Sequence, residues 1–336
     1  MRRRELRAVL IALLAVATAG CGSAASVRLS APSHRAHAVW TKYLHVRRPL
    51  DLAGPRPGGS FVLAADGRLW QLLPSGRVEP FARAYDIPGA AEPYIATPAP
   101  VHEGCSFGAG AVYALRLRAP RGVTKISPDG RVGSFAVLSA SGLIDGITFD
   151  ETGDFGHRLL VTIGAGSHTT VDALSCHGGV TTITHNAPKV EGGIAVAPRR
   201  FGRFAGDLIA PDEISGRIYA ITPRGASTVL ANSGLPHGQD VGVESETFIP
   251  TLKRYSVLVA DRLTPGNRHP GDDELLRISS SSLGKAGVRS GALLVTSEGG
   301  ARTDAITCRA AGCQVLHVAD GPAIAHIEGH IAVAPR

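Results

Sequence analysis

The chain has 336 residues, of which 41 are Gly and 22 are Pro, and its apolar fraction is 44%. This composition favours many short elements joined by tight turns around a buried core over a disordered chain. The formal net charge is +7, but the body of the chain contains no Lys/Arg run, so nucleic acid is not an expected partner.

Residues 1–20 have the pattern of a leader that is removed during export. Four Arg residues among the first seven precede an apolar run, residues 8–17, which is too short to span a bilayer. The stretch Thr18-Ala19-Gly20-Cys21 resembles the lipobox of bacterial lipoproteins, although Thr18 departs from the usual Leu or Val. We therefore expect an exported chain anchored to the cell membrane by lipid on Cys21, with a plain secretory signal as the alternative.

Residues 21–58 are predicted to be the lipidated Cys and a flexible tether. Ser, Ala, Pro and Arg dominate this stretch, and Pro and Gly punctuate its end. Trp40, Tyr43 and Leu44 are apolar exceptions that we expect to pack on the folded domain. That domain is predicted over residues 59–336.

Within the folded domain, a short phrase recurs in which an acidic residue precedes an apolar strand. It occurs at residues 92–96, 144–149, 190–198, 243–250, 304–307 and 327–335. A second recurrent strand ends in a polar turn, as in residues 61–66 and 256–261, and a third unit is a hairpin with a Pro-x-Gly turn, as in residues 216–226. No long stretch has the 3.6-residue period of a helix.

Residues 191–233 show these units in order and predict a four-stranded antiparallel unit of about 45 residues, the length of a propeller blade. Six acidic phrases predict an all-β, six-bladed β-propeller, although the uneven spacing near residues 260–330 leaves the division of the last blades open. The last phrase stops at the chain end and lacks its partner strands, while residues 61–66 lack a first partner. We therefore predict ring closure by N- and C-terminal strands in one blade.

These phrases resemble six-bladed propellers of the NHL, SMP-30 (gluconolactonase-like) and TolB-like type. The resemblance covers residues 60–336 and is clearest in EGGIAVAP and GRIYAITPRG. It implies the fold, and it leaves the function open because propellers host many unrelated activities.

Export changes how the cysteines are interpreted. With Cys21 assigned to lipid, four Cys remain, and an oxidising compartment favours their pairing. Cys308 and Cys313 flank a turn-like stretch and are predicted to form one disulfide, which leaves Cys105 with Cys176. A zinc site is the rival interpretation, but the spacing lacks a second Cys pair of the usual kind.

The recurring acidic position predicts a ring of carboxylates at one mouth of the axial channel, because the innermost strands line that channel. The ring consists of Glu92, Asp145, Glu191, Glu244, Asp304 and Glu328. Carboxylate oxygens suit a hard cation such as Ca²⁺. The resemblance implies the same for Glu191 and Glu328, each followed by Gly as in SMP-30-like enzymes, although the Asn ligands of those enzymes have no counterpart here. The alternative is that each carboxylate caps backbone amides as a staple of the blades.

Histidines near these phrases are further candidates for metal ligation or acid–base chemistry. They are His237, with Asp240 three residues later, and His326 and His330 on either side of Glu328. Ordinary surface histidines are the alternative. The chain contains no G-x-S-x-G, H-E-x-x-H or phosphate-binding Gly-rich motif.

The sequence thus favours a monomeric module that binds a small molecule or an envelope protein and meets the membrane through its lipid anchor alone. The alternative is a divalent-metal-dependent hydrolase of the lactonase or phosphotriesterase kind, with its carboxylates at the channel. A further alternative is a propeller similar to quinone-dependent sugar dehydrogenases.

Overall fold

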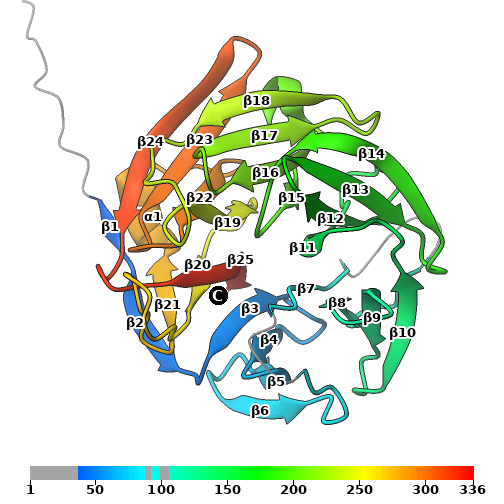
Figure 1. Cartoon of the computed structure of the whole chain (residues 1–336). Helices are drawn as coiled ribbons and strands as arrows, with labels where there is room; N and C mark the ends of the chain where they lie inside the picture. The colour runs from blue at the N-terminus through cyan, green and yellow to red at the C-terminus, as the bar shows by residue number, and fades with distance from the viewer. Residues whose placement is uncertain (1–36, 88–91, 99–105) are drawn as a thin grey trace, which may run out of the picture. The chain divides into compact units, whose positions relative to one another are not determined.

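The computed structural model describes residues 37–87, 92–98 and 106–336, which form six β-sheets arranged as a ring (Figure 1). The chain is therefore a six-bladed β-propeller, as the sequence predicts. The helices in the described residues are α1 (Ser280–Ala286) and the 3₁₀ helix η1 (Gly202–Phe204). Neither combines the length and hydropathy that a membrane-crossing helix needs.

Four blades each consist of four consecutive strands, with the first strand innermost. Blade 1 contains β3 (Pro49–Ala53), β4 (Phe61–Ala65), β5 (Arg68–Leu72) and β6 (Val78–Phe81). Blade 2 contains β7 (Ile95–Ala96), β8 (Val112–Arg116), β9 (Gly122–Ile126) and β10 (Val132–Val137). Blade 3 contains β11 (Leu143–Phe149), β12 (Leu159–Ala165), β13 (His168–Leu174) and β14 (Val180–Pro188). Blade 4 contains β15 (Ala195–Val196), β16 (Leu208–Asp212), β17 (Arg217–Ile221) and β18 (Ser227–Asn232).

The turn between the third and fourth strands repeats in both sequence and bonding. Gly76 and Gly225 of the Pro-x-Gly turns have φ values of 86° and 82°, in the left-handed region that favours glycine. Their N–H groups donate to the carbonyls of Leu73 and Thr222 at 2.9 and 2.8 Å. The hairpin predicted from this motif is confirmed.

The last two blades exchange strands. Blade 5 contains β19 (Val243–Phe248), β22 (Leu293–Ser297), β23 (Thr303–Arg309), β24 (Gly312–Asp320) and the parallel edge strand β1 (Ala38–Val39). Blade 6 contains β25 (Ile327–Pro335), β20 (Tyr255–Asp261), β21 (Glu274–Ser279) and β2 (Thr41–His45). The chain therefore leaves blade 5 after its innermost strand, builds the middle of blade 6, passes through α1 and returns to blade 5.

Blade 6 takes strands from near both ends of the described chain, with β25 innermost and β2 outermost (Figure 1). The predicted closure is therefore confirmed, but its predicted partner strand is wrong. Phe61–Ala65 pairs with β3, and β25 pairs with β20. Because β1, β2 and β3 all lie before residue 58, the predicted tether is too long, and the propeller already includes residues 38–53.

The exchange of strands also explains two misplaced elements. Asp304 lies on β23, the third strand of blade 5, and not on an innermost strand. The run that ends at Asp320 lies on β24, the fourth strand, where the sequence predicts a second strand. The second strand of this blade is β22, because β20 and β21 belong to the neighbouring blade.

The core consists of apolar layers between adjacent blades. Between blades 2 and 3, Phe107 packs edge-on against Phe149 with ring centroids 4.9 Å apart, and Tyr113 packs edge-on against Phe149 at 5.4 Å. A second layer, between blades 5 and 6, contains Val257, Leu276 and Leu294 with Trp40. Such packing between neighbouring sheets excludes water from these blade contacts and holds the innermost strands in place.

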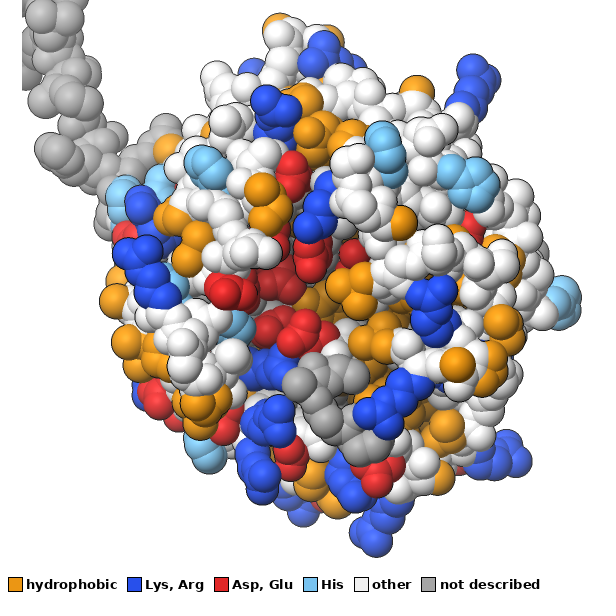
Figure 2. Space-filling view, viewed as in Figure 1, with side chains coloured by type: hydrophobic (Ala, Val, Ile, Leu, Met, Phe, Trp, Pro, Cys, Tyr) orange, Lys and Arg blue, Asp and Glu red, His pale blue; other side chains and the backbone are white. Residues whose placement is uncertain are grey.

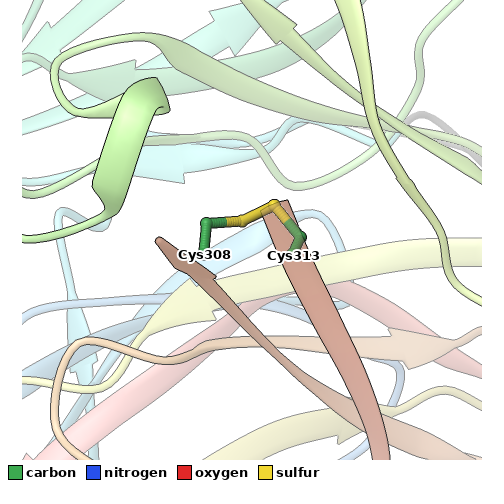
Figure 3. Close-up of a disulfide and its surroundings, with 2 residues drawn as sticks. All are labelled: Cys308 and Cys313. Atoms are coloured by element: carbon green, nitrogen blue, oxygen red, sulfur yellow. A yellow bond between two sulfur atoms is a disulfide. The ribbon is translucent and has the colours of Figure 1, made fainter. Parts of the chain in front are cut away.

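The predicted disulfide between Cys308 and Cys313 is confirmed. It joins β23 to β24 at the end of their hairpin, where the two residues are directly opposite each other (Figure 3). Cys176 is also disulfide-bonded. Cys105, its predicted partner, and Cys21 lie outside the described residues.

Trp40 joins the N-terminal strands to both exchanged blades. Its side chain is 2% exposed, and its indole N–H donates to the hydroxyl of Thr303 at 2.8 Å. Its backbone N–H donates to the carbonyl of Asp320 at 2.9 Å. The expectation that Trp40 packs on the domain is confirmed.

We expect Trp40→Ala to lower the free energy of unfolding by about 3–5 kcal/mol, because it opens a cavity between blades 5 and 6. Urea denaturation followed by circular dichroism measures this loss. Val39→Ala is the control, since Val39 is 61% exposed and its truncation should cost less than about 0.5 kcal/mol. Equal effects of the two substitutions would contradict a structural role for Trp40.

Candidate functional site

The innermost strands approach one another so closely that the acidic phrase requires glycine. Gly192 has a φ of +82°, and a Cβ atom there would lie 2.3 Å from the carbonyl oxygen of Glu244 in the next blade. Gly329 has a φ of +68°, and a Cβ atom there would lie 2.5 Å from Oδ1 of Asp51. The recurrence of acid followed by Gly therefore has a steric cause at the narrowest part of the ring.

Three buried side chains converge where the exchanged strands of blades 5 and 6 meet. Nε2 of His326 lies 3.1 Å from Oε1 of Glu298 and 3.2 Å from Oε1 of Glu328. The three residues are at most 6% exposed. We call Glu298, His326 and Glu328 the seam cluster.

The backbone holds the seam cluster in position. Glu298 follows β22, and its N–H donates to the carbonyl of Gly242 at 2.6 Å, while its carbonyl accepts from Ile327 at 2.9 Å. The N–H of His326 donates to Oδ1 of Asp261, at the end of β20, at 2.9 Å. The cluster therefore takes its residues from two blades and depends on their exchanged strands.

Four further side chains extend the seam cluster into the channel. The hydroxyl of Tyr94 donates to Glu244 and lies 3.2 Å from Oε2 of Glu328. The guanidinium of Arg262 bonds to Glu92 and lies 3.3 Å from Oε1 of Glu328. Glu328 is thus the residue shared by every part of this network.

The carboxylates of this network outnumber the cations bonded to them. Burial, and next the charge of Glu328, raises the pKa of Glu298 to about 9. Burial likewise raises the pKa of Glu244 well above its usual range. Among the described residues, Arg262 is the one permanent cation that bonds to Glu92 or Glu328. The mutual repulsion of the carboxylates in this network is relieved either by protonation or by a bound cation.

The donor atoms of the seam cluster have the spacing of metal ligands. Ligands about 2.1 Å from an ion, at tetrahedral or octahedral angles, are about 3.0–3.4 Å apart, and the two separations from His326 Nε2 are 3.1 and 3.2 Å. His326 Nδ1 is buried and has no hydrogen-bond partner among the described residues. One imidazole and two carboxylates suit a first-row divalent ion such as Zn²⁺ or Mn²⁺.

The predicted carboxylate ring is thus present only in part. Glu244 and Glu328 lie in the network, and Glu92 joins it through Arg262. Asp145 accepts from the hydroxyl of Thr162 at 2.9 Å. Glu191 pairs with Lys189 at 3.4 Å. Both line a cavity of about 160 Å³ that Tyr94 and Glu244 also line.

Asp304 does not belong to the ring. It lies on β23, and its Oδ1 is 2.7 Å from Nδ1 of His317. Its place on the third strand of blade 5 puts it away from the innermost strands that line the channel. The sixth innermost strand is β3, whose acidic residue is Asp51.

The candidate histidines fall into separate places. Nδ1 of His330 lies 3.0 Å from Oδ2 of Asp51. His330 also lines a separate cavity of about 370 Å³ between the innermost strands. Burial lowers the pKa of His330, but the charge of Asp51, its hydrogen bond with His330 and a backbone hydrogen bond together raise that pKa. His237 is exposed, on a loop that packs over Gly216, and the N–H of Asp240 donates to Glu213 at 2.8 Å. Of the predicted histidines, the structure places only His326 in the seam cluster.

Sequence reasoning missed Glu298, Arg262, Tyr94 and Asp51. Glu298 is followed by Gly299, as Glu191 and Glu328 are followed by glycine, but it stands at the end of a second strand. Leu50-Asp51-Leu52 is an acidic residue beside apolar ones, within the stretch assigned to the tether. No pattern in the sequence singles out Arg262 or Tyr94.

A hollow gives access to this network. Figure 2 shows acidic side chains at the floor of a central depression, with Lys and Arg side chains beside them. A cavity of about 530 Å³ lies next to Glu92, and its lining includes Arg47, Arg48 and Arg262. The positive charge of these guanidinium groups would attract a negatively charged molecule to this cavity.

We expect the pH dependence of stability to change in Glu213→Gln. Burial, and next the charge of Glu191, raises the pKa of Glu213 from 4.5 to about 7. The folded chain therefore keeps a proton that the unfolded chain has lost, and the free energy of unfolding falls as pH rises through this window, by up to about 1.4 kcal/mol per unit. The substitution should flatten this slope, as measured by urea denaturation at several pH values.

Glu79→Gln is the matched control, because Glu79 lies half-exposed on β6 in an ion pair with Arg77. It should leave the slope unchanged. A slope in Glu213→Gln equal to that of the unsubstituted chain would show that Glu213 does not hold this proton.

Comparisons with known proteins support the fold and leave the activity open. No protein-family model and no curated protein matches the chain. Among solved structures, a protein of unknown function from Bacteroides thetaiotaomicron is 11% identical with a TM-score of 0.50, covering 88% of this chain and 69% of that chain. Virginiamycin B lyase from Staphylococcus aureus is 13% identical with a TM-score of 0.47, covering 83% and 74%.

A putative TolB from Agrobacterium tumefaciens is 10% identical with a TM-score of 0.46, covering 86% of this chain and 91% of that chain. At these identities the likeness extends to the propeller architecture alone. The fold that the sequence resemblance implies is confirmed by the six sheets of the chain, which form a six-bladed β-propeller.

Proposed function

We propose that the chain is a divalent-metal-dependent hydrolase whose metal centre is the seam cluster. The observation that carries the proposal is the approach of His326 Nε2 to carboxylate oxygens of Glu298 and Glu328, at 3.1 and 3.2 Å, in a buried setting. If these carboxylates had only a structural role, capping backbone amides, their oxygens would accept hydrogen bonds from backbone N–H groups. Here the contacts join side chain to side chain.

The residues of the seam cluster and of the network around it have distinct roles in this proposal. Glu298, His326 and Glu328 would hold the ion, which supplies Lewis acidity toward a carbonyl or phosphoryl oxygen. Arg262, 3.3 Å from Glu328, would attract an anionic substrate group and balance charge during the reaction. Glu244, whose pKa burial raises, would hold or release a proton through its hydrogen bond with Tyr94. Esters, lactones and phosphoesters are the substrate classes that such a set of groups suits.

The nitrogen donor of His326 favours Zn²⁺ or Mn²⁺ over Ca²⁺, which prefers oxygen ligands only. The expectation of Ca²⁺ from the sequence stays a prediction, and the metal titration described next tests it.

We expect the purified chain to bind one divalent ion tightly at the seam cluster. We expect Glu298→Gln, His326→Ala and Glu328→Gln each to weaken this binding at least about 100-fold. Calorimetric titration with Zn²⁺, Mn²⁺ and Ca²⁺ measures this. Glu191→Gln is the matched control, since Glu191 pairs with Lys189 outside the seam cluster. If Glu191→Gln weakens binding as strongly as Glu328→Gln, the complete ring predicted from the sequence is the better description.

The same variants test turnover. A panel of lactones and phosphoesters, assayed with the tightest ion, should reveal hydrolysis that falls at least about 100-fold in His326→Ala and stays within about twofold in Glu191→Gln. Metal binding without hydrolysis of any panel member would reject the hydrolase in favour of a binding module.

A binding module is the second candidate because of the separate cavity that His330 lines between the innermost strands. This cavity has a volume of about 370 Å³ and takes lining residues from the innermost strands of all six blades. Its apolar lining includes Leu52, Ile95, Ile147, Phe149, Phe248 and Ile331. A small apolar molecule is the ligand that such a lining would hold.

We also propose that the chain acts outside the cytoplasm, anchored by lipid on Cys21. The support is the basic and apolar pattern of residues 1–20 and the disulfide between Cys308 and Cys313, which persists in an oxidising compartment. Expressed in a bacterial host with labelled palmitate, the unsubstituted chain should take up label and sediment with membranes, and Cys21→Ser should do neither. An unlabelled chain that stays in the cytoplasmic fraction would contradict this localisation.

A further inference from the structure

A second group of metal-ligand side chains lies on the outer part of blade 5, where the N-terminal strand joins it. His317 and Asp320 belong to β24, and His37 directly precedes β1. One donor atom from each of these three residues lies within 4.8 Å of the other two. The imidazoles of His37 and His317 pack edge-on, with centroids 4.9 Å apart.

Asp304 determines which nitrogen of His317 is free to bind an ion. Nδ1 of His317 lies 2.7 Å from Oδ1 of Asp304, which is 4% exposed. An ionised carboxylate only accepts, so Nδ1 carries the proton and Nε2 of a neutral ring presents its lone pair. This is the arrangement in which a buried carboxylate orients a metal-binding histidine.

The free nitrogen faces another acceptor. Nε2 of His317 lies 3.1 Å from Oδ1 of Asp320. Two acceptors at this distance repel each other unless a proton or a cation lies between them. Arg302, with its Nε 3.7 Å from Oδ1 of Asp320, balances part of the charge but does not lie between the two atoms.

His37 supplies the third donor. Its Nδ1 lies 3.7 Å from Oδ2 of Asp320, which is too long for a hydrogen bond. Donors in a tetrahedral zinc site are about 3.3 Å apart, between the two separations observed here. Two imidazoles and one carboxylate are a usual ligand set for Zn²⁺, with water in the fourth position.

We propose that His37, His317 and Asp320 bind a zinc ion that fastens the N-terminal strand to blade 5, with Asp304 as the positioning residue. The strand β1 pairs with β24 through only Ala38 and Val39, so its own backbone contacts are few. The ion joins His37, at the start of this strand, to the body of the propeller. The position of His37 on blade 5 then depends on zinc.

The first experiment is calorimetric zinc titration of the full chain and of His37→Ala. His37 is exposed at the edge of the fold, so its removal should not unfold the chain, and we expect the loss of one bound ion. Asp304→Asn should retain the ion with an affinity lowered about 10–100-fold. His168→Ala is the control, because His168 is an exposed residue on β13 of another blade.

His326→Ala separates this site from the seam cluster. If His37→Ala and His326→Ala each lose one ion and the double variant loses two, both sites are supported. If only His37→Ala loses an ion, the zinc site of His37, His317 and Asp320 is supported and the metal centre at the seam cluster is rejected. Hydrogen exchange gives a second measure: zinc should slow exchange of the amides of Val39 and Trp40 in the unsubstituted chain but not in His37→Ala. Unchanged zinc stoichiometry in His37→Ala would overturn the proposal, in which case a bridging proton on His317 explains its short contacts.

Discussion

The exchange of strands between blades 5 and 6 is the constraint on which the rest of the molecule depends. Because β20 and β21 interrupt the strands of blade 5 and lie between β25 and β2 in blade 6, neither blade is complete without the other. Closing the ring therefore requires long-range pairing between residues 255–261 and the chain end, and between residues 41–45 and residues 274–277. Trp40 seals this junction from the outside, and the seam cluster lies in it near the axis.

This topology also explains why the candidate site is concentrated at one part of the ring. Regular blades bring one acidic residue each to the channel, at the start of the innermost strand. At the exchanged blades, the ends of β20 and β22 reach the same place as the start of β25, so Arg262 and Glu298 join His326 and Glu328. More ionisable side chains therefore meet at blades 5 and 6 than the one acidic residue that each regular blade supplies. Repulsion among their carboxylates favours a proton or a cation there.

The sequence predicted the repeat and the closure of the ring because both depend on local patterns. An acidic residue before an apolar strand identifies five of the innermost strands, including β11, β19 and β25. It failed at β3, because the Pro and Gly that follow Leu50-Asp51-Leu52 resemble a tether. It failed at Asp304 because strand order in the exchanged blades is decided by long-range pairing that no local pattern records. Arg262 and Tyr94 enter the site for the same reason, through topology alone.

The partners of each acid distinguish its role better than its position in the repeat does. Asp51 accepts the backbone N–H groups of Leu52, Ile95 and His330, and so joins three blades through amides that would otherwise be unpaired. Asp150 accepts four backbone N–H groups in the same way within one loop. In both residues the backbone donates to each of the two carboxylate oxygens. Among the described residues, no backbone N–H donates to the carboxylate of Glu298, which faces His326 and Glu328 instead, so burial acts against its charge. An acid that is bonded to amides holds strands or a loop together, whereas the burial of Glu298 against other acids opposes its charge, and it is the second kind of acid that the exchanged blades bring together.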